Sequence, residues 1–419
     1  MKILILSTFE RAGGAAVAAN RLMHALNKSG HEAKMLVRDK QTDDVNVVSI
    51  NTNRWKKKIN FIRFAYERWV IFLNNRFNRK NLFAISIANT GTDISRHPLI
   101  KEADVIHLHW INQGFLSLED IRKLTELGKP VVWTMHDMWC FTGVCHYAGN
   151  CRKYVTQCEN CALIKKNITD KTKHLFAKKK SAISACTINF VGCSQWIAKK
   201  AKESALLRNA AITAIPNAID TGFFKPCDKM YVRQKFNLPN DKKLILFAAA
   251  KLSDTRKGMT YFVNACEKLV AGGMKELIEI VFLGGEIDVN LLPVTTLNAH
   301  VLGYLKTPAE ISMIYAACDI FVTSSLEDNL PNTIMEAMAC GIPCVGFNIG
   351  GIPEMIDHKV NGYVAEYKSS EDLAAGIDWC LNPENRRLLS EQALLKARNC
   401  YVENVVARQY VEIYERSRM

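Results

Sequence analysis

The chain has 419 residues, of which 48% are hydrophobic, 23% charged and 9% aromatic. This length and composition exclude a single small binding module and a disordered or fibrous protein. The formal net charge of +14 is uneven, because residues 1–220 hold 34 Lys and Arg against 17 Asp and Glu, whereas residues 221–419 hold 21 against 24. We therefore expect one part that meets an anionic surface and one that does not.

The apolar runs of the chain are all shorter than the stretch of about 18 residues that crosses a bilayer, and no signal-peptide pattern opens the sequence. We expect a cytoplasmic protein. Its 14 cysteines are far fewer than a disulfide scaffold of this size would contain, so thiols are expected rather than disulfides.

Short apolar strands alternate with helical stretches throughout. In the first half, strands are predicted at residues 2–7, 33–37, 104–109, 130–135, 188–192 and 211–216, with a helix at 15–29. In the second half, strands are predicted at 243–250, 279–285, 300–304, 319–325 and 343–347, with helices at 258–271, after Pro308 and after Pro331. Runs rich in Val, Ile and Leu on both faces are typical of parallel strands buried between helices. The sequence predicts two doubly wound α/β domains.

The boundary between the domains is predicted where the periodicity stops. Residues 215–229 contain Pro216, Gly222 and Pro226 and no sustained pattern. We expect a basic, acceptor-binding domain and a nucleotide-sugar-binding domain, the first over residues 1–218 with a C-terminal helix at 402–419 and the second over 219–401. Ligands bind outside the carboxyl ends of strands in such sheets, so the loops after strands are expected to line a central cleft.

Residues 53–80 form an insertion that is both basic and aromatic. It contains nine Lys or Arg, seven aromatic residues and the single acid Glu67. Aromatic spacings of three to five predict a helix whose apolar face holds Phe61, Phe64, Trp69 and Phe72. Such a helix suits an anionic membrane interface, or it packs its aromatic face onto its own domain. Nucleic acid is disfavoured because no recognised nucleic-acid motif accompanies the charge.

The most informative stretch is residues 321–345. A strand is followed by a loop with Glu327 and Asp328 and by a helix that begins at Pro331. Glu336 lies in that helix among apolar residues, where a carboxylate is costly to bury unless it accepts hydrogen bonds. Asp328 and Glu336 either accept hydrogen bonds from ligand hydroxyls or pair within the protein. The N–H groups at the start of the helix favour a phosphate.

Asp328 and Glu336, separated by seven residues, resemble the E-x7-E motif of the retaining glycosyltransferases of family 4, which have the GT-B architecture of two Rossmann-like domains. The resemblance implies that Glu336 binds the ribose hydroxyls of a sugar nucleotide and that Asp328 contacts the donor sugar and the phosphates. Asp328 is one methylene shorter than the usual Glu, and Glu327 beside it leaves open which acid faces the sugar. Asn332 and Thr333 belong to the same implied donor site.

Residues 248–258 resemble the family's cationic segment after a strand. Lys251 stands where Arg is usual and Lys257 fits the second position, which implies that these residues neutralise the donor diphosphate, with Arg256 as an additional candidate. Gly14 follows the first strand and resembles the family's N-terminal glycine loop. The G-x-G-x-x-G pattern of dinucleotide-dependent oxidoreductases is absent there.

Three further segments resemble family landmarks. His136 and Asp137 end a buried strand and resemble the family's His-Asp element, which implies that His136 contacts the donor sugar near the reacting carbon. Tyr304 and Leu305 fit the base-binding loop. The loop on the diphosphate side is matched by residues 347–356, with Gly350, Gly351 and Glu354 as candidates.

The sequence contains no D-x-D motif that would suggest a metal bridging the diphosphate. The resemblance therefore implies metal-independent transfer with retention at the anomeric carbon and no required cofactor. Charge on the leaving group must be met by Lys251, Lys257 and the helix that begins at Pro331. The catalytic candidates are His136, Asp328 and Lys257, and no nucleophile is assigned.

Five cysteines cluster within residues 140–161. The last four, Cys145, Cys151, Cys158 and Cys161, have the spacing C-x5-C-x6-C-x2-C. Four thiolates suffice for a closed tetrahedral zinc site, although the spacing matches no standard zinc finger. The alternative is a group of ordinary thiols.

These observations predict a hexosyltransferase that moves sugar from a UDP- or GDP-sugar to a glycan acceptor. A lipid-linked acceptor at an anionic membrane surface, in capsule or O-antigen assembly, would explain the basic aromatic insertion. Two alternatives stay open, namely a GT-B sugar-nucleotide epimerase or hydrolase and a zinc-stapled nucleic-acid-binding protein, which would leave Glu336 unexplained.

Overall fold

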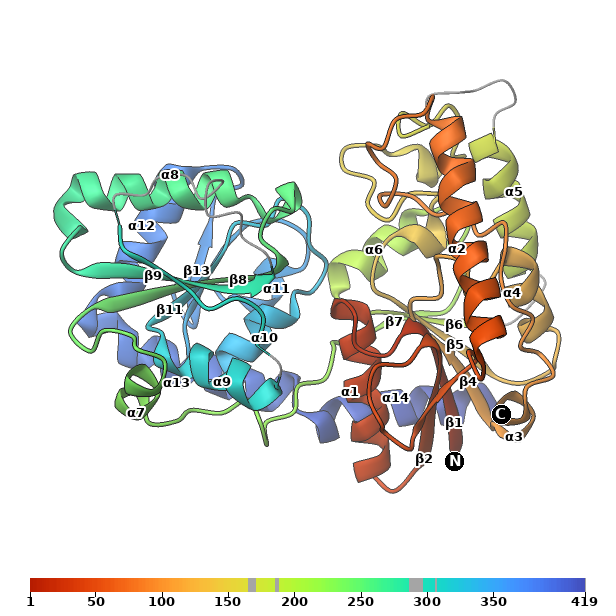
Figure 1. The fold of residues 1–419 in the computed structure, drawn as a ribbon, viewed down its shortest axis with the longest axis horizontal. Coiled ribbons are helices and arrows are strands. Elements are labelled where there is room, and N and C mark those ends of the chain that lie inside the picture. The colour runs from red at the N-terminus through yellow and green to blue at the C-terminus, as the bar shows by residue number, and fades with distance from the viewer. Residues whose placement is uncertain (165–170, 185–187, 286–296, 306, 419) are drawn as a thin grey trace. The chain divides into compact units, whose positions relative to one another are not determined.

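The computed structural model describes residues 1–164, 171–184, 188–285, 297–305 and 307–418 (Figure 1). The chain divides into two compact units. Unit 1 comprises Met1–Pro216 together with Val406–Met419, and unit 2 comprises Asn217–Val405. Each unit is built on one parallel sheet.

Unit 1 holds a seven-stranded sheet in the order β3-β2-β1-β4-β5-β6-β7. The strands are β1 (Lys2–Phe9), β2 (Glu32–Asp39), β3 (Val47–Ser49), β4 (Val105–Leu108), β5 (Val131–Met135), β6 (Ile188–Gly192) and β7 (Ile212–Ala214). β1 pairs with β2 on one side and with β4 on the other, both in parallel. The strand order therefore reverses at β1, and the carboxyl edge beside β1 and β4 is where sheets of this kind bind ligands.

The helices of unit 1 cover both faces of its sheet. They are α1 (Gly14–Lys28), α2 (Arg54–Asn74), α3 (Pro98–Glu102), α4 (Leu118–Thr125), α5 (Lys171–Ser184), α6 (Gln195–Glu203) and, from Val406 onward, α14 (Glu403–Arg418). α14 packs onto the central strands, because the Tyr414 hydroxyl lies 2.8 Å from His107 Nδ1 and the Tyr410 hydroxyl 3.0 Å from Thr134 Oγ1. The end of the chain thus completes the core of unit 1.

Unit 2 holds a six-stranded parallel sheet in the order β10-β9-β8-β11-β12-β13. The strands are β8 (Lys243–Lys251), β9 (Ile278–Gly285), β10 (Ala299–Val301), β11 (Ile320–Thr323), β12 (Cys344–Phe347) and β13 (Gly362–Ala365). The helices are α7 (Lys229–Lys235), α8 (Met259–Leu269), α9 (Pro308–Ala317), α10 (Asn332–Ala339), α11 (Ile352–Met355), α12 (Ser370–Leu381) and α13 (Pro383–Cys400). Here the strand order reverses between β8 and β11.

The predicted fold class is confirmed, since both sheets are parallel and their central strands are apolar and buried on both faces. Burying each Val, Leu or Ile side chain contributes about 1.5–3 kcal/mol relative to its exposure, so these strands organise each core. The sequence pattern missed β3 and β13, which have only three and four residues. The predicted helix at 258–271 is an α-helix only as far as Leu269. It continues as a π-helical turn over Val270–Met274, in which Gly273 has a φ of 90°.

Candidate functional site

Three loops meet at the carboxyl edge of the unit 2 sheet. The Leu326 N–H, after β11, donates to the Arg256 carbonyl, after β8, at 2.7 Å. The Ser324 hydroxyl donates to the Gly258 carbonyl at 2.8 Å. Gly258 has a φ of 65°, and a Cβ there would lie 2.0 Å from the Ser324 carbonyl oxygen, so a residue with a side chain would force the loops apart.

The closed loops bring a cation and an acid together. Lys257 Nζ lies 2.7 Å from Asp328 Oδ2, and the Ser325 hydroxyl lies 3.4 Å from the same oxygen. Both charged side chains are partly exposed, at 29% for Lys257 and 14% for Asp328. The pair therefore offers a fixed ammonium and a fixed carboxylate to a ligand that approaches this edge.

The loop after β12 completes the edge. Gly350 has a φ of 61°, and a Cβ at this position would lie 1.7 Å from the Asp328 carbonyl oxygen. Such a contact is impossible without backbone movement, so only glycine allows this loop to lie against the Asp328 loop. The predicted candidates Gly350 and Asp328 are therefore in direct contact.

Glu336 is buried on α10, at 9% exposure. The Tyr315 hydroxyl on α9 donates to Glu336 Oε2 at 3.1 Å, which satisfies part of the carboxylate. Burial, reinforced by the Glu336 charge, holds the pKa of Tyr315 well above its ordinary value, so the phenol stays a donor. No side chain caps α10 at Pro331, and the Asn332 side chain accepts a hydrogen bond from Asn217 at 3.0 Å.

The remaining candidates of unit 2 differ in their surroundings. Arg256 pairs with Asp254 at 2.7 Å, whereas Lys251 is an exposed cation at the end of β8. Burial raises the pKa of Glu327, although the charge of Arg256 opposes the shift. The predicted base-binding residues are not enclosed, because Tyr304 is 73% exposed and Leu305 is half-buried. Thr333, in the first turn of α10, is also half-buried.

The predicted catalytic residue His136 and the glycine of the N-terminal loop lie in unit 1, where Gly14 opens α1. His136 follows β5, and its Nε2 lies 2.8 Å from Nδ1 of His109, which follows β4. Burial lowers the pKa of His136 to about 4, so its imidazole is neutral near pH 7. A neutral imidazole can donate a hydrogen bond to a hydroxyl or accept one from it without placing a positive charge in the site.

Asp137, next to His136, is held by three donors. Trp110 Nε1 donates to Asp137 at 2.9 Å, the Trp139 N–H donates at 2.8 Å, and His146 Nδ1 lies at 2.7 Å. Burial alone would raise the pKa of Asp137, but the His146 charge and hydrogen bond, together with the other donors, keep that pKa below its usual value. This carboxylate fixes the loop that carries His136.

Sequence reasoning missed His109, Trp110 and His146 as neighbours of the His-Asp element. The alternation of residues 104–110 carried a signal for the first of them, because His107 and His109 are two residues apart at a strand end and so share one face. His146 had no such signal, since a loop of irregular structure brings it back to Asp137.

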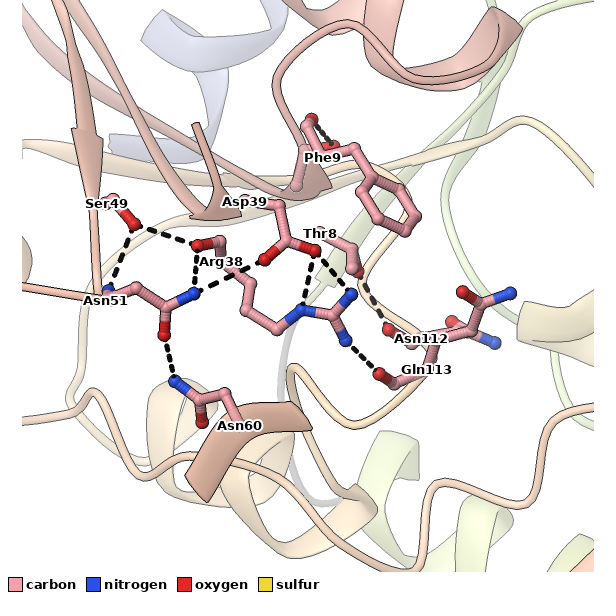
Figure 2. A network of polar contacts seen from close by, with 10 residues as sticks. Thr8, Phe9, Arg38, Asp39, Ser49, Asn51, Asn60, Asn112 and Gln113 are labelled. Atoms are coloured by element: carbon pink, nitrogen blue, oxygen red, sulfur yellow. Dashed lines mark hydrogen bonds and ion pairs between the residues drawn. The ribbon is translucent and has the colours of Figure 1, made fainter. Parts of the chain in front are cut away.

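A second polar network lies at the carboxyl ends of β1, β2 and β3 (Figure 2). Arg38 pairs with Asp39 at 2.6 Å and donates to the backbone carbonyl of Gln113. The Asn51 amide donates to the Arg38 carbonyl at 2.8 Å, and the Asn60 amide of α2 donates to the Asn51 side chain at 2.6 Å. The network therefore attaches α2 to the strand ends.

The face by which α2 is attached is polar. Asn60, Glu67 and Arg68 are all buried. Glu67 accepts hydrogen bonds from the backbone N–H groups of Ile87 and Ala88 at 2.9 and 3.0 Å, and Arg68 pairs with Glu67 at 3.1 Å. The ion pair and these hydrogen bonds offset part of the cost of burying this face, although Glu67 Oε2 and Arg68 Nε have no hydrogen-bond partner in the described part of the chain.

The opposite face of α2 exposes large apolar side chains. We call it the exposed stripe; its members recur every three or four residues and are Trp55, Ile59, Ile62, Tyr66 and Trp69. Trp55 is 74% exposed and Trp69 55%, and Lys56, Lys57 and Lys58 are exposed beside the first of them. Among the residues that the structure describes, no helix is both long and apolar enough to cross a bilayer.

The predicted composition of the aromatic face was therefore partly wrong. Phe64 and Phe72 are half-buried, whereas Phe61 and Trp69 are exposed in different directions around the helix. The interpretation in which α2 packs its aromatic face onto its own domain does not hold. α2 instead buries its polar groups in unit 1.

Comparison with known protein families decides the relationship. A model described as Glycosyltransferase Family 4 matches residues 12–223, which is half of the chain, and a model described as Glycosyl transferases group 1 matches residues 242–383. The chain belongs to Glycosyltransferase Family 4. The resemblance seen in the sequence is thereby confirmed.

Among relatives of this family 4 chain, an N,N'-diacetylbacillosaminyl-diphospho-undecaprenol alpha-1,3-N-acetylgalactosaminyltransferase of Campylobacter jejuni is 31% identical over 182 residues. The match spans 43% of this chain and 46% of that protein, less than half the length of the relative.

Two solved structures share the fold over nearly the whole of both chains. Sucrose-phosphate synthase of Thermosynechococcus elongatus has a TM-score of 0.70 at 16% identity, with 99% of this chain and 98% of that chain covered. Anabaena HepE in complex with UDP and glucose has a TM-score of 0.64 at 16% identity, with 99% of each chain covered. Both likenesses show the GT-B fold.

The cysteine cluster of this family 4 chain lies in the loops after η1 (Trp139–Phe141). Cys145 and Cys158 are buried, Cys161 is half-buried and Cys151 is exposed. Over the ranges that the structure describes, no group of three or more His, Cys, Asp or Glu side chains could hold a metal ion. The structure thus does not assemble the four cysteines into the predicted zinc site.

Proposed function

We propose that the protein is a retaining, metal-independent glycosyltransferase that moves a hexose from a nucleoside diphosphate sugar to a lipid-linked glycan acceptor. The observation that carries the proposal is the unit 2 sheet edge, where Lys257 and Asp328 form a 2.7 Å pair beside α10, which holds Glu336. A diphosphate needs cations, a ribose needs hydroxyl acceptors and a sugar needs a nearby acid, and this edge provides all three.

In this proposal each donor group has a partner in unit 2. The Glu336 carboxylate accepts hydrogen bonds from the ribose hydroxyls, while Tyr315 keeps the carboxylate in place from behind. Lys257 and the exposed Lys251 stabilise the charge that builds on the departing diphosphate, so no metal is needed for this step. Asp328 orients Lys257 and accepts a hydrogen bond from the sugar.

His136 in unit 1 is proposed to contact the donor sugar. Its pKa of about 4, which results from burial, keeps the ring neutral at physiological pH. A neutral ring can hold a sugar hydroxyl without repelling the positive charge that develops at the anomeric carbon during retaining transfer. His109 holds the ring through the hydrogen bond between their nitrogens.

The acceptor is proposed to be a polyprenyl-diphosphate glycan of surface polysaccharide assembly. The Campylobacter relative is named for an acceptor of this chemical kind. The exposed stripe of α2 supports the proposal, because aromatic side chains with adjacent lysines suit the headgroup region of an anionic membrane. The protein would then act as a peripheral protein on the cytoplasmic membrane face.

A transfer assay tests the proposed function. Purified protein is incubated with UDP- and GDP-sugars and with a polyprenyl-diphosphate-linked sugar, and the products are separated by mass. We expect one donor to extend the acceptor by one hexose with the anomeric configuration retained. Release of free sugar at the same rate without acceptor would instead indicate a hydrolase.

Membrane association is tested separately with vesicles that contain phosphatidylglycerol. Reversing the charge of Lys56, Lys57 and Lys58 to Glu should abolish co-sedimentation with these vesicles. A matched control reverses Lys235, Lys242 and Lys275 of unit 2. Unchanged co-sedimentation of the α2 variant would overturn the membrane part of the proposal.

The structural zinc of the cysteine cluster stays a prediction. Elemental analysis of the purified protein and its melting temperature with and without a chelator test it. One zinc per chain and a lower melting temperature with chelator would support a zinc bound by Cys145, Cys151, Cys158 and Cys161.

A further inference from the structure

An apolar cavity of about 450 Å³ lies between α2 and α5 in unit 1. Figure 1 shows these two helices side by side. The cavity volume is within the range of about 300–1,000 Å³ that small-molecule sites occupy. Its walls come from both helices and from the segments at Ile85 and Ile164, and the residues that matter here are Val70, Ile87, Lys171, His174 and Leu175.

Six of the ten residues that line the cavity are branched aliphatic, and the other four are Asn74, Asn89, Lys171 and His174. The polar groups that line it are partly engaged with one another, because Lys171 Nζ donates to Asn74 Oδ1 at 2.7 Å and Asn74 Nδ2 donates to the Val70 carbonyl at 2.6 Å. The lining is mainly apolar, so a sugar or a nucleotide would replace only a few of the hydrogen bonds to water that it loses there. A hydrocarbon is the chemistry that fits.

The cavity lies next to the exposed stripe. Val70 of the cavity wall is one helical turn after Tyr66 and directly follows Trp69, both members of the stripe. If the stripe lies in the membrane interface, a chain that leaves the bilayer beside α2 reaches the cavity over apolar side chains.

One fixed positive charge belongs to the lining of the cavity. Lys171, the first residue of α5, carries it and is exposed. Lys171 donates to the neutral side chain of Asn74, so its ammonium can also contact an anion. A hydrocarbon that ends in a diphosphate would match both the walls and the mouth.

We propose that this cavity binds the first isoprene units of the lipid-linked acceptor, with the diphosphate held at the Lys171 mouth. The proposal rests on the proposed function, because it assumes a polyprenyl-diphosphate acceptor, and it adds where the tail of that acceptor is held. The tail site belongs to unit 1, like the exposed stripe and His136.

Chain-length dependence in the unmodified protein is the first test. Dimethylallyl, geranyl and farnesyl diphosphate are titrated by calorimetry below their micelle concentrations, with inorganic pyrophosphate as the headgroup alone. We expect affinity to rise at least tenfold from dimethylallyl to farnesyl diphosphate, because each added isoprene buries more apolar surface. Equal affinity for pyrophosphate and farnesyl diphosphate would overturn the proposal.

Filling the cavity is the second test. Ile87→Trp and Leu175→Trp place an indole in it, and we expect each to weaken farnesyl diphosphate binding at least tenfold. Leu127→Trp places the same indole at an exposed position of unit 1 that does not line the cavity, and it should bind farnesyl diphosphate as the unmodified protein does. Unfolding of unit 1 is excluded if each cavity variant shows the same urea unfolding midpoints as the unmodified protein. Normal farnesyl diphosphate binding by both folded cavity variants would overturn the proposal.

A third comparison separates the tail of an acceptor from the acyl chains of membrane lipid. Dihexanoyl phosphatidylglycerol is titrated in place of farnesyl diphosphate, and we expect at least tenfold weaker binding. Stronger binding of the phospholipid would overturn the acceptor assignment in favour of a membrane-lipid site. Failure of the proposed function is seen independently, as the absence of sugar transfer to a polyprenyl-linked acceptor despite normal farnesyl diphosphate binding.

Discussion

Replacement of Glu336 by Gln tests the donor site with little change in volume. The proposed role of Glu336 is to accept hydrogen bonds from ribose hydroxyls, and a hydrogen bond to a charged group contributes about 1.5–3 kcal/mol. At about 1.4 kcal/mol for each factor of ten, its loss weakens donor binding by roughly 10- to 150-fold. Tyr315 can still donate to the amide oxygen, so the free protein should unfold at nearly the same denaturant concentration.

The assay is isothermal titration of UDP, GDP and their sugars into the unmodified protein and the Glu336→Gln variant. Glu391→Gln, which neutralises an exposed carboxylate on α13, is the matched control and should bind as the unmodified protein does. The reasoning is refuted if Glu336→Gln binds the donor normally. A variant that binds poorly because it has unfolded is recognised by its denaturant midpoint.

Three further predictions concern the two units. Lys257→Met should weaken donor binding about 10- to 100-fold by calorimetry, because it removes a charge-assisted contact with the diphosphate; normal affinity would remove Lys257 from the site. Gly350→Ala should destabilise unit 2 by about 1–3 kcal/mol in urea and weaken donor binding, because its Cβ meets the Asp328 carbonyl at 1.7 Å, whereas Gly272→Ala has open space and should do neither. Burial lowers the pKa of His107 to about 3 and of His136 to about 4, so below about pH 6.5 protons bind the unfolded chain preferentially and stability falls. Each histidine should lower the free energy of unfolding by about 2 kcal/mol between pH 7 and pH 5. Urea titrations at both pH values should show a smaller decrease for His107→Gln than for the unmodified protein.

Much of the fold was predictable because buried parallel strands have a strong local signal. The run at residues 243–250 is apolar at nearly every position, and the structure places it as β8 in the middle of the unit 2 sheet. β13 was not predictable in the same way, since its four residues begin with Gly362 and have too little length to show a pattern. Strand pairing, rather than composition, makes it a strand.

The candidate site was predictable only in part. Spacing predicted that Asp328 and Glu336 share a strand-helix unit, and the resemblance added Lys257 from the preceding strand. The 2.7 Å contact between Lys257 and Asp328 depends on two loops 71 residues apart, which no local pattern encodes. The contact between Gly350 and the Asp328 carbonyl could not be predicted. A glycine in the sequence indicates that another backbone can approach closely, but it does not indicate which one.

The orientation of α2 was the least predictable feature. Its periodicity shows that the helix has two faces but does not show which face is buried, and the usual assumption places aromatic residues inside. Here Glu67 and Arg68 are buried instead, where the N–H groups of Ile87 and Ala88 and nearby carbonyls provide part of their hydrogen bonds. Those partners lie about twenty residues later in an irregular segment, beyond the reach of any helical pattern.

The central claim is that the unit 2 sheet edge binds a nucleoside diphosphate sugar. The most direct measurement is the melting temperature of the unmodified protein and of Glu336→Gln with UDP, GDP, ADP, CMP and the corresponding sugars. A ligand at about 100 times its dissociation constant stabilises the folded state by about 2.7 kcal/mol, so one nucleoside diphosphate should raise the melting temperature by several degrees in the unmodified protein and by much less in the variant. No shift with any nucleotide, or an equal shift in both proteins, would contradict the claim.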